Sequence, residues 1–216
     1  MPSEQFLNLP SEKQTNILNS CLEEFASYGF ETASTNRIVN RAGISKGVLF
    51  KYFKDKESLF LYVCEMVLKQ VVELFSINNM ERFDDLFSFL KYITLQKIMV
   101  YKKHPEMYRL FLRIIRNPEH PIYSKIARTT TMITNDYMAN VVRVWSSDGL
   151  NPDVSKERAI SAILWILEGI QNKYLLSAPD ATDNDQFDVF CQQLLLEIDQ
   201  YFELLKYGMY SRKHEN

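Results

Sequence analysis

The sequence predicts an all-α protein, and three observations support that prediction. Apolar residues recur at the helical period along almost the whole chain, and no alternating pattern bounded by turn residues indicates a strand. Only six glycines and seven prolines punctuate the 216 residues. The apolar content of 46% is enough to bury a sizeable core. The chain is therefore expected to form one helical domain, or a small helical domain attached to a larger one.

The first strong helical segment is predicted over about residues 11–28. Ser11, with Gln14 three residues later, forms a capping-box pattern at its start. An apolar face then runs as far as Tyr28-Gly29, where the glycine is expected to end the helix.

Two short helices are predicted next. Thr35 can cap the first of them, and Gly43 is expected to end it. Ser45 can cap the second, which is expected to run to Tyr52 or Phe53. Two short helices separated by about three residues are typical of a helix-turn-helix.

A long fourth helix is predicted from Asp55, its expected cap, to about Asn78-Asn79. Proline and glycine residues separate the remaining helical segments. These segments are expected at about residues 83–103, 105–116, 121–147, 154–176 and 185–207.

Positive charge is concentrated in one short part of the chain. The net charge is −2, but residues 35–56 alone carry +5, which leaves −7 for the rest. A local basic unit inside an acidic protein is a candidate for contact with nucleic acid.

The third predicted helix separates a buried face from an exposed one. Leu49 and Phe53 lie one turn apart, so they can pack against the first helix. Ile38, Ala42 and Ile44 are expected to join them and hold the two short helices at a fixed angle.

The opposite face of that helix combines two cations, two aromatic rings and bare backbone. Gly47 inside a helix costs about 1 kcal/mol relative to alanine, and close approach of the backbone to a ligand would explain it. Such a surface suits a DNA major groove, although a solvated packing unit with ordinary surface lysines is the alternative. The paired residues on this face are Lys46 with Phe50, Gly47 with Lys51, and Val48 with Tyr52.

The run from Thr35 to Leu59 resembles the DNA-binding signature of the tetracycline-repressor (TetR) family. The matching stretches are Ala42-Gly43-Ile44-Ser45-Lys46-Gly47, Tyr52-Phe53 and Lys56-Glu57-Ser58-Leu59. The resemblance implies a homodimeric transcription repressor with a helix-turn-helix DNA-binding domain over 1–54. It also implies a larger helical domain for effector binding and dimerisation over 55–216.

The resemblance also implies which side chains meet double-stranded operator DNA. Positions used for phosphate or base contact are occupied by Thr35, Lys46, Phe50, Tyr52 and Lys56, and the flanking residues are Arg37, Ser45, Gly47, Val48 and Lys51. The family usually has tyrosine where Phe50 stands. A base contact there must therefore be apolar, for example with a thymine methyl group.

Two C-terminal helices are too apolar for one protein interior. Pairing both helices with their symmetry mates in a homodimer would bury the second face, as the resemblance also implies, whereas a helix buried inside a monomer is the alternative. The residues expected at the interface are Ile163, Ile166, Ile170, Phe190, Leu194, Ile198 and Phe202.

The middle of the chain is rich in aromatic residues and methionines, which form plain core or, by the resemblance, line a cavity for a small effector. The candidate lining residues are Tyr92, Tyr108, Phe111, Tyr137 and Trp165. A nearby basic cluster is either a solvated face or an attraction for an acidic effector such as an acyl thioester. It comprises Lys97, Lys102, Lys103, Arg109, Arg113 and Arg116. A small effector, hydrophobic or acyl-type, is therefore expected.

No catalytic site, metal site or cofactor is predicted. The three histidines lack ligand spacing, and no nucleotide-binding or nucleophile motif occurs. Two adjacent pairs of acids, Glu23-Glu24 and Asp84-Asp85, diverge by about 100° around a helix and are interpreted as solvated charges.

The chain is expected to be cytoplasmic and to bind no membrane. No secretory signal pattern is visible, and the most apolar segment contains Glu168 and Lys173, so it predicts a buried helix. The three cysteines are expected to be buried thiols of a reduced protein. They are Cys21, Cys64 and Cys191.

Three alternatives remain open at this point. A helical ligand-binding or sensing protein would bind DNA weakly and without sequence preference, and a helical enzyme would turn over a co-purifying ligand. An activator of the same fold would share every residue discussed above.

Overall fold

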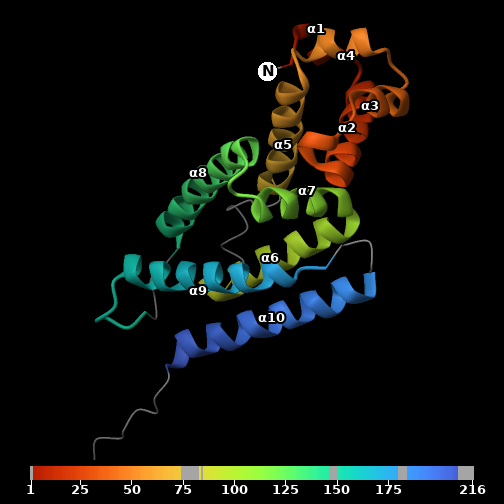
Figure 1. The fold of residues 1–216 in the computed structure, drawn as a ribbon. Helices are drawn as coiled ribbons and strands as arrows, with labels where there is room; N and C mark the ends of the chain where they lie inside the picture. The colour runs from red at the N-terminus through yellow and green to blue at the C-terminus, as the bar shows by residue number, and fades with distance from the viewer. Residues whose placement is uncertain (1, 74–82, 84, 146–149, 180–183, 209–216) are drawn as a thin grey trace, which may run out of the picture. The chain divides into compact units, whose positions relative to one another are not determined.

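The computed structural model describes residues 2–73, 83, 85–145, 150–179 and 184–208 (Figure 1). Over these residues the regular structure is entirely α-helical, which confirms the predicted all-α class. The helices are α1 Glu4–Leu7, α2 Ser11–Thr32, α3 Thr35–Ala42, α4 Lys46–Tyr52, α5 Lys56–Glu73, α6 Leu86–Lys103, α7 Pro105–Arg116, α8 Pro121–Val144, α9 Lys156–Ser177 and α10 Asn184–Tyr207.

The chain divides into two compact units. The first unit comprises Met1–Phe75 and Met99–Ile133, and it holds α1 to α5, the end of α6, α7 and the start of α8. The second unit comprises Ser76–Ile98 and Thr134–Asn216, and it holds the rest of α6 and α8 together with α9 and α10. The predicted boundary between residues 54 and 55 stays a prediction.

The predicted capping box at Ser11 is wrong. Ser11 is already helical, and Pro10 stands at the cap position without a side-chain hydrogen bond. The Gln14 amide instead donates to the carbonyl oxygens of Leu7 at 3.0 Å and Leu9 at 2.9 Å. Leu7 ends the short helix α1 and Leu9 follows it, and the sequence did not predict this helix. The Gln14 amide therefore bonds to the preceding turn and does not complete a capping box.

The end of α2 is bent rather than terminated at the predicted glycine. Gly29 has φ 71° and ψ 178°, a conformation that is essentially restricted to glycine. One further helical turn follows it and ends at Thr32. The bend frees backbone carbonyls on both sides of Gly29, and their partners matter for the site described below.

The caps of the next three helices are largely as predicted. Ser34 rather than Thr35 caps α3, because its side chain accepts from the backbone N–H of Arg37 at 3.4 Å. Gly43, with φ 68°, ends α3 in the left-handed conformation, and Ser45 accepts from the Val48 N–H at 3.2 Å. Asp55 caps α5 by accepting from the Ser58 N–H at 2.7 Å.

The core of the first unit confirms the predicted inner face of the helix-turn-helix. Leu49 and Phe53 are buried, as are Ile38 and Ala42, and the partly buried Ile44 packs against them. Aromatic contacts extend this core to neighbouring helices. The ring of Phe25 lies 4.8 Å from that of Phe60, and the ring of Phe6 lies 4.9 Å from that of Phe53.

The second unit places α9 and α10 side by side (Figure 1). Its core includes Phe89 of α6 and Phe187 of α10, each about 1% exposed. Two ion pairs join α10 to the region of α6: Lys91 meets Asp199 at 2.6 Å, and Lys206 meets Asp85 at 2.7 Å. The interpretation of Asp85 as a solvated charge is therefore wrong, and Asp84 lies outside the described residues.

The later helices agree with their predicted ranges within a few residues. For α7 both ends match, since proline starts it and Arg116 ends it. The three cysteines are buried free thiols, as predicted. No helix in the described part of the chain is long and apolar enough to cross a membrane.

Candidate nucleic-acid interface

The outer face of α4 presents part of the surface that the sequence predicts, with one exposed aromatic ring and not two. Lys46, Gly47, Phe50 and Lys51 are exposed, and the ring of Phe50 is 38% exposed despite being apolar. Val48 and Tyr52 are half-buried. The surface available to a partner is therefore a patch of two lysines, one phenylalanine and bare backbone, which we call the α4 face.

Packing gives no reason for glycine at position 47. A Cβ atom built there would meet only the Ser45 hydroxyl oxygen, at 3.9 Å, and the backbone has no positive φ. The helix thus carries a residue that weakens it without any benefit to the fold. Close approach of another molecule to this stretch of backbone would explain the choice.

The two lysines of the α4 face have no interaction partner among the described residues. Across the described residues, neither Lys46 nor Lys51 forms an ion pair or hydrogen bond, and no aromatic ring lies under either ammonium group. Thr35 is half-buried at the first position of α3, and Ser45 is exposed at the cap of α4. These residues surround a positive surface with which no acidic side chain of the described residues forms an ion pair.

Tyr52, at the end of α4, is held by the N-terminal segment. Its carbonyl oxygen accepts from the Ser3 N–H at 2.9 Å. Its ring lies 5.7 Å from that of Phe6, which is fully buried. Helix α1 therefore fixes the C-terminal end of α4, a role for which the apolar character of Phe6 was the available signal in the sequence.

Lys56, a predicted contact residue, is engaged inside the first unit. Its ammonium donates to the carbonyl oxygens of Glu31 at 3.0 Å and Ala33 at 3.3 Å. It also lies 4.8 Å from the centroid of the Phe30 ring. A cation at the C-terminal end of α2 stabilises the helix dipole there and satisfies carbonyls that the bend leaves open.

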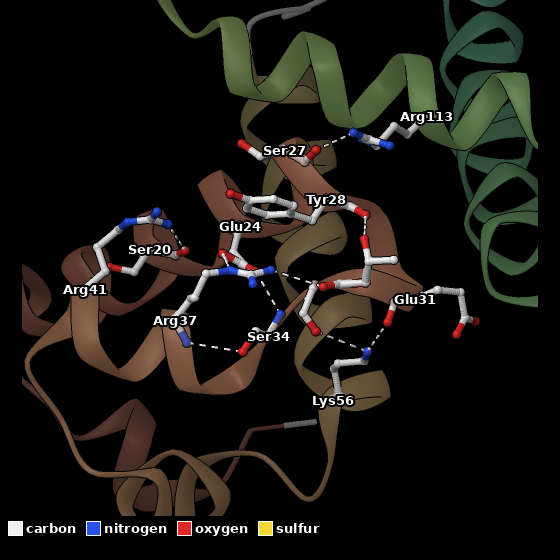
Figure 2. A network of polar contacts seen from close by, with 12 residues as sticks. Ser20, Glu24, Ser27, Tyr28, Glu31, Ser34, Arg37, Arg41, Lys56 and Arg113 are labelled. Carbon is white, nitrogen blue, oxygen red and sulfur yellow. Dashed lines mark hydrogen bonds and ion pairs between the residues drawn. The ribbon is translucent and has the colours of Figure 1, made fainter.

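Arg37, another predicted contact residue, is paired with Glu24 (Figure 2). The shortest contact, from Nη2 to Oε1, is 2.6 Å, and the Glu24 side chain is 0% exposed. The interpretation of Glu24 as a solvated charge is therefore wrong. It lies seven residues after buried Ile17 and three after Cys21, so its place on the apolar face was the available signal.

The carboxylate of Glu24 stays ionised in its buried position. Burial by itself opposes ionisation, but hydrogen bonds from the Arg37 guanidinium and the Ser34 N–H outweigh it. The pKa of Glu24 consequently lies below its usual value.

Arg113 of α7 holds the other side of the α2 bend, as Figure 2 shows for its contact with Ser27. Its Nε donates to the Ala26 carbonyl at 2.7 Å, and its Nη2 donates to that of Ser27. The Tyr123 hydroxyl of α8 accepts from the Phe30 N–H at 2.9 Å. Polar groups from α3, α5, α7 and α8 thus form hydrogen bonds with the backbone at the bent end of α2.

The predicted dimer residues divide into two groups in the single chain. Ile166, Phe190 and Leu194 are half-buried. The other four are already buried within the second unit: Ile163, Ile170, Ile198 and Phe202. The exposed large apolar residues on the described parts of the same two helices are different ones, namely Trp165, Val189, Leu196, Tyr201, Leu204 and Tyr207.

The surface of α9 and α10 is hollowed at two places. A groove of about 200 Å³ is lined by Ile166, Gly169 and Ile170 of α9 and by Tyr201 of α10, with Lys173 and Glu197 at its side. A second hollow of about 460 Å³ lies where α9 ends and α10 begins, lined in part by Tyr174 and Phe190. Lys173 and Glu197 pair at 2.8 Å.

The predicted effector-lining residues are distributed over both units. Tyr108 and Phe111 of the first unit both contact Tyr101, with ring centroids 5.2 and 5.7 Å apart. In the second unit Tyr92 contacts Phe83 at 5.0 Å, and burial raises the pKa of the Tyr137 phenol. Trp165 is 73% exposed, so it lies on the surface of its unit. A cavity formed by these residues stays a prediction.

Within the described ranges, no group of three or more His, Cys, Asp or Glu side chains is placed to hold a metal ion.

Two family models match the sequence around this geometry. The model for bacterial regulatory proteins of the tetR family matches residues 17–63, which include α3 and α4. The model for the tetracyclin repressor-like C-terminal domain matches residues 84–210, more than half of the chain. The chain belongs to the tetR family of bacterial regulatory proteins. As a family member it is a transcriptional regulator of the helix-turn-helix type, as the sequence resemblance predicted.

Curated relatives of this TetR-family chain are also regulators. It is 25% identical over 171 residues to the uncharacterized HTH-type transcriptional regulator YerO of Bacillus subtilis, covering 76% of this chain and 55% of YerO. It is 33% identical over 104 residues to the HTH-type transcriptional regulator RutR of Escherichia coli, covering 47% of each chain. The chain thus matches about half of the length of these curated relatives.

Solved structures share the fold over nearly the whole length. A TetR family transcriptional regulator from Chloroflexus aurantiacus superimposes with a TM-score of 0.62 at 23% identity, covering 98% of this chain and all of that one. Thermus thermophilus FadR, a TetR family repressor solved in complex with lauroyl-CoA, gives a TM-score of 0.54 at 17% identity. That match covers 94% of this chain and 97% of FadR.

Proposed function

We propose that this regulator is a repressor that binds a pseudo-palindromic operator in duplex DNA as a homodimer, with one α4 helix entering a major groove from each subunit. The observation that carries the proposal is the α4 face. Its two exposed lysines have no counter-charge in the described protein, and an exposed ring and bare backbone lie between them.

Each residue of the α4 face has a distinct task under this proposal. Lys46 and Lys51 bind phosphates, which supplies affinity, and Gly47 lets the backbone approach the DNA. Phe50 contacts a thymine methyl group and so favours particular base pairs. The hydroxyls of Thr35, Ser45 and Tyr52 bind phosphate oxygens at the ends of α3 and α4, with Val48 packed between them.

The homodimer is proposed to form through the outer face of α9 and α10. Six large apolar side chains are exposed on the described parts of these two helices, and a symmetric partner would remove them from water. Gly169 lies in the groove between the helices, where the absence of a side chain allows close approach. Two recognition helices in successive major grooves would then lie about 34–36 Å apart.

The effector is proposed to be a small hydrophobic or acyl-type molecule that binds beside aromatic residues of α7. Tyr108 and Phe111 of this helix are buried and half-buried, and they supply apolar surface with a polar tip on the tyrosine. The likeness of fold to FadR, which was solved with lauroyl-CoA, supports an acyl-type ligand. Release from DNA requires that the effector bind one conformation of the repressor more tightly than the other.

Fluorescence anisotropy with DNA from upstream of the regulator's own gene tests the DNA-binding proposal. At near-physiological salt and with excess competitor DNA, a dissociation constant of about 10⁻⁸ M or tighter is expected. Lys46→Ala should weaken binding about tenfold, because it removes one phosphate contact from the α4 face. Arg158→Ala, which removes an exposed cation from α9, is the matched control and should leave binding unchanged.

Two results would count against this proposal. Binding no tighter than to competitor DNA, for every upstream fragment tested, would favour the ligand-sensing alternative. Equal weakening by Lys46→Ala and Arg158→Ala would show that only overall charge matters. Measuring neighbouring transcripts after deletion of the gene separates a repressor, for which they rise, from an activator, for which they fall.

Dimerisation is tested separately by analytical ultracentrifugation. Leu196→Glu places a charge in the middle of the exposed apolar face of α10 and should yield monomers. Val154→Glu introduces the same charge at an exposed valine before α9, so it should leave the dimer intact. A dimer that survives Leu196→Glu, Trp165→Glu and their combination would place the interface elsewhere.

A further inference from the structure

We propose that Arg37 is a positioning residue that acts through the buried Glu24, and that it makes no contact with DNA. Its guanidinium binds the buried carboxylate of Glu24 and thereby fixes the first turn of α3 against the bent end of α2. This inference rests on the proposed DNA binding through α4, since α4 is the element whose orientation would be set.

The guanidinium of Arg37 is held on several sides (Figure 2). Its Nε lies 2.8 and 3.1 Å from the two carboxylate oxygens of Glu24, and its Nη2 donates to the Thr32 carbonyl at 3.1 Å. Its carbon atom Cζ lies 4.1 Å from the centroid of the Tyr28 ring. A planar group bound at both an acid and a carbonyl, and stacked on a ring, has little freedom to turn toward a phosphate.

Glu24 ties two points of the chain at the start of α3. Besides Arg37, the third residue of that helix, it accepts from the N–H of Ser34, its cap, at 2.7 Å. The side chain is 0% exposed, so it cannot itself reach DNA. A buried carboxylate is tolerated only with such partners, which is why the contact specifies one placement of α3 on α2.

The placement of α3 carries over to α4. Only residues 43–45 separate the two helices, and the Ile44 N–H donates to the Val39 carbonyl at 3.1 Å, which closes the turn tightly. Ile38 of α3 and Leu49 of α4 are both fully buried in the same core. A change in the tilt of α3 would therefore displace the α4 face as a unit.

The charges of Arg37 and Glu24 also distinguish a positioning role from a direct contact with DNA. Because Glu24 cancels the charge of Arg37, the pair releases no counterion when DNA binds, whereas a phosphate-bound lysine does. A direct contact and a positioning role thus make opposite predictions for the salt dependence of operator binding. They also make opposite predictions for the removal of the Glu24 charge.

The experiment is a double-mutant cycle with Glu24→Gln and Arg37→Met, scored by the operator dissociation constant over a series of salt concentrations. Glu24→Gln removes a negative charge, which by itself would tighten DNA binding. The positioning role predicts the reverse sign: each single variant weakens binding at least fivefold. The double variant should be no weaker than the worse single one, because both disturb the same contact.

The slope of log Kd against log salt should be the same in the parent and in all three variants. Glu23→Gln is the matched control, since it removes the neighbouring charge, which is exposed, and should not weaken binding. The fraction of active protein, from titration at high DNA concentration, separates loss of folded protein from loss of affinity. Only a change in affinity supports the proposal.

The proposal is overturned if Glu24→Gln binds as tightly as the parent or more tightly, or if Arg37→Met lowers the slope by about 0.9, the value for one phosphate contact. If Arg37→Met does not fold, Arg37→Lys replaces it. A lysine would keep a phosphate contact but cannot span both Glu24 oxygens, so weakening with an unchanged slope still supports positioning. A parent protein without operator specificity would instead reject the proposed function.

Discussion

The two helices of the helix-turn-helix use their cations in opposite ways. On α3, Arg37 is bound to Glu24, and Arg41 donates to the Ser20 carbonyl at 3.3 Å and lies 3.4 Å from Glu23. On α4, Lys46 and Lys51 have no such partner in the described structure. The positive charge of a segment therefore does not show which of its cations are free to bind DNA. The decisive feature is whether the fold brings a carboxylate or open carbonyl within reach of each cation.

The largest effect that tests this contrast is on stability. Arg37→Met should lower the free energy of unfolding clearly more than the loss of either α4 lysine does, because it leaves the buried Glu24 carboxylate without its main partner. The Arg37 side chain is 45% exposed, so water relieves part of the penalty. Lys46→Met and Lys51→Met should each change stability by no more than about 0.5 kcal/mol. Urea unfolding followed by circular dichroism measures all three.

Equal losses of stability in the three variants would show that Arg37, bound to Glu24, contributes no more to folding than the two lysines of the α4 face. A near-neutral Arg37→Met would do the same, since it would mean that water replaces the guanidinium at no cost.

The next effect concerns the bend of α2, on which α3 rests. Gly29→Ala should destabilise the protein by about 2 kcal/mol or more, because the new Cβ must adopt a glycine-only conformation. That atom would also lie 3.0 Å from the Tyr123 hydroxyl and 3.4 Å from Arg113 Nη1. Thermal unfolding of the variant gives the measurement.

Gly43→Ala is the comparison for a glycine in the ordinary left-handed region with open space around it. Gly43 also has a positive φ, of 68°, but nothing lies within 4 Å of a Cβ atom there. Its substitution should cost about 1 kcal/mol. If the two variants lose the same stability, neither the glycine-only backbone at position 29 nor the close neighbours of the new Cβ atom adds to the cost there.

A smaller effect is expected in acid. The pKa of Glu24 lies below its usual value, so its ionised form contributes stability above that usual value, near pH 4.3. This contribution is lost as the pH falls through the lower, folded-state pKa. Glu24→Gln should therefore reduce stability at neutral pH and show a shallower fall of Tm between about pH 5 and pH 3.

Glu23→Gln is again the comparison, since the exposed Glu23 should leave the acid limb unchanged. A parallel fall in the parent and in Glu24→Gln would show that other carboxylates, such as Asp85 beside Lys206, dominate acid unfolding.

The sequence predicted the fold class, the family and most helix boundaries because these depend on local patterns. Apolar periodicity, the glycine at position 43 and the caps at Ser45 and Asp55 act within a few residues. The partners of Arg37 and Lys56 could not be predicted in the same way. Their contacts join residues 13 and up to 25 positions apart, across a bend whose geometry only the folded chain provides.

The unpredicted role of α1 has the same cause. Phe6, Leu7 and Leu9 are too few apolar residues for a periodic pattern, yet the Phe6 ring meets those of Tyr52, Phe53 and Tyr62. The dimer residues stay a prediction for a related reason. Periodicity correctly marked Ile163 and Ile198 as apolar-face residues, but it could not tell a face buried within the chain from one left for a partner.

The smallest expected effect compares two ion pairs that have nearly the same N–O distance but differ in burial. Lys125 and Glu57 pair at 2.7 Å, nearly the separation of Arg37 and Glu24, but both side chains are about half exposed. A double-mutant cycle with Lys125→Met and Glu57→Gln should give a coupling energy below about 0.5 kcal/mol. The same cycle at Arg37 and Glu24 should give several times more. A large coupling at the exposed pair would mean that N–O distance, and not burial, sets the strength of ion pairs in this protein.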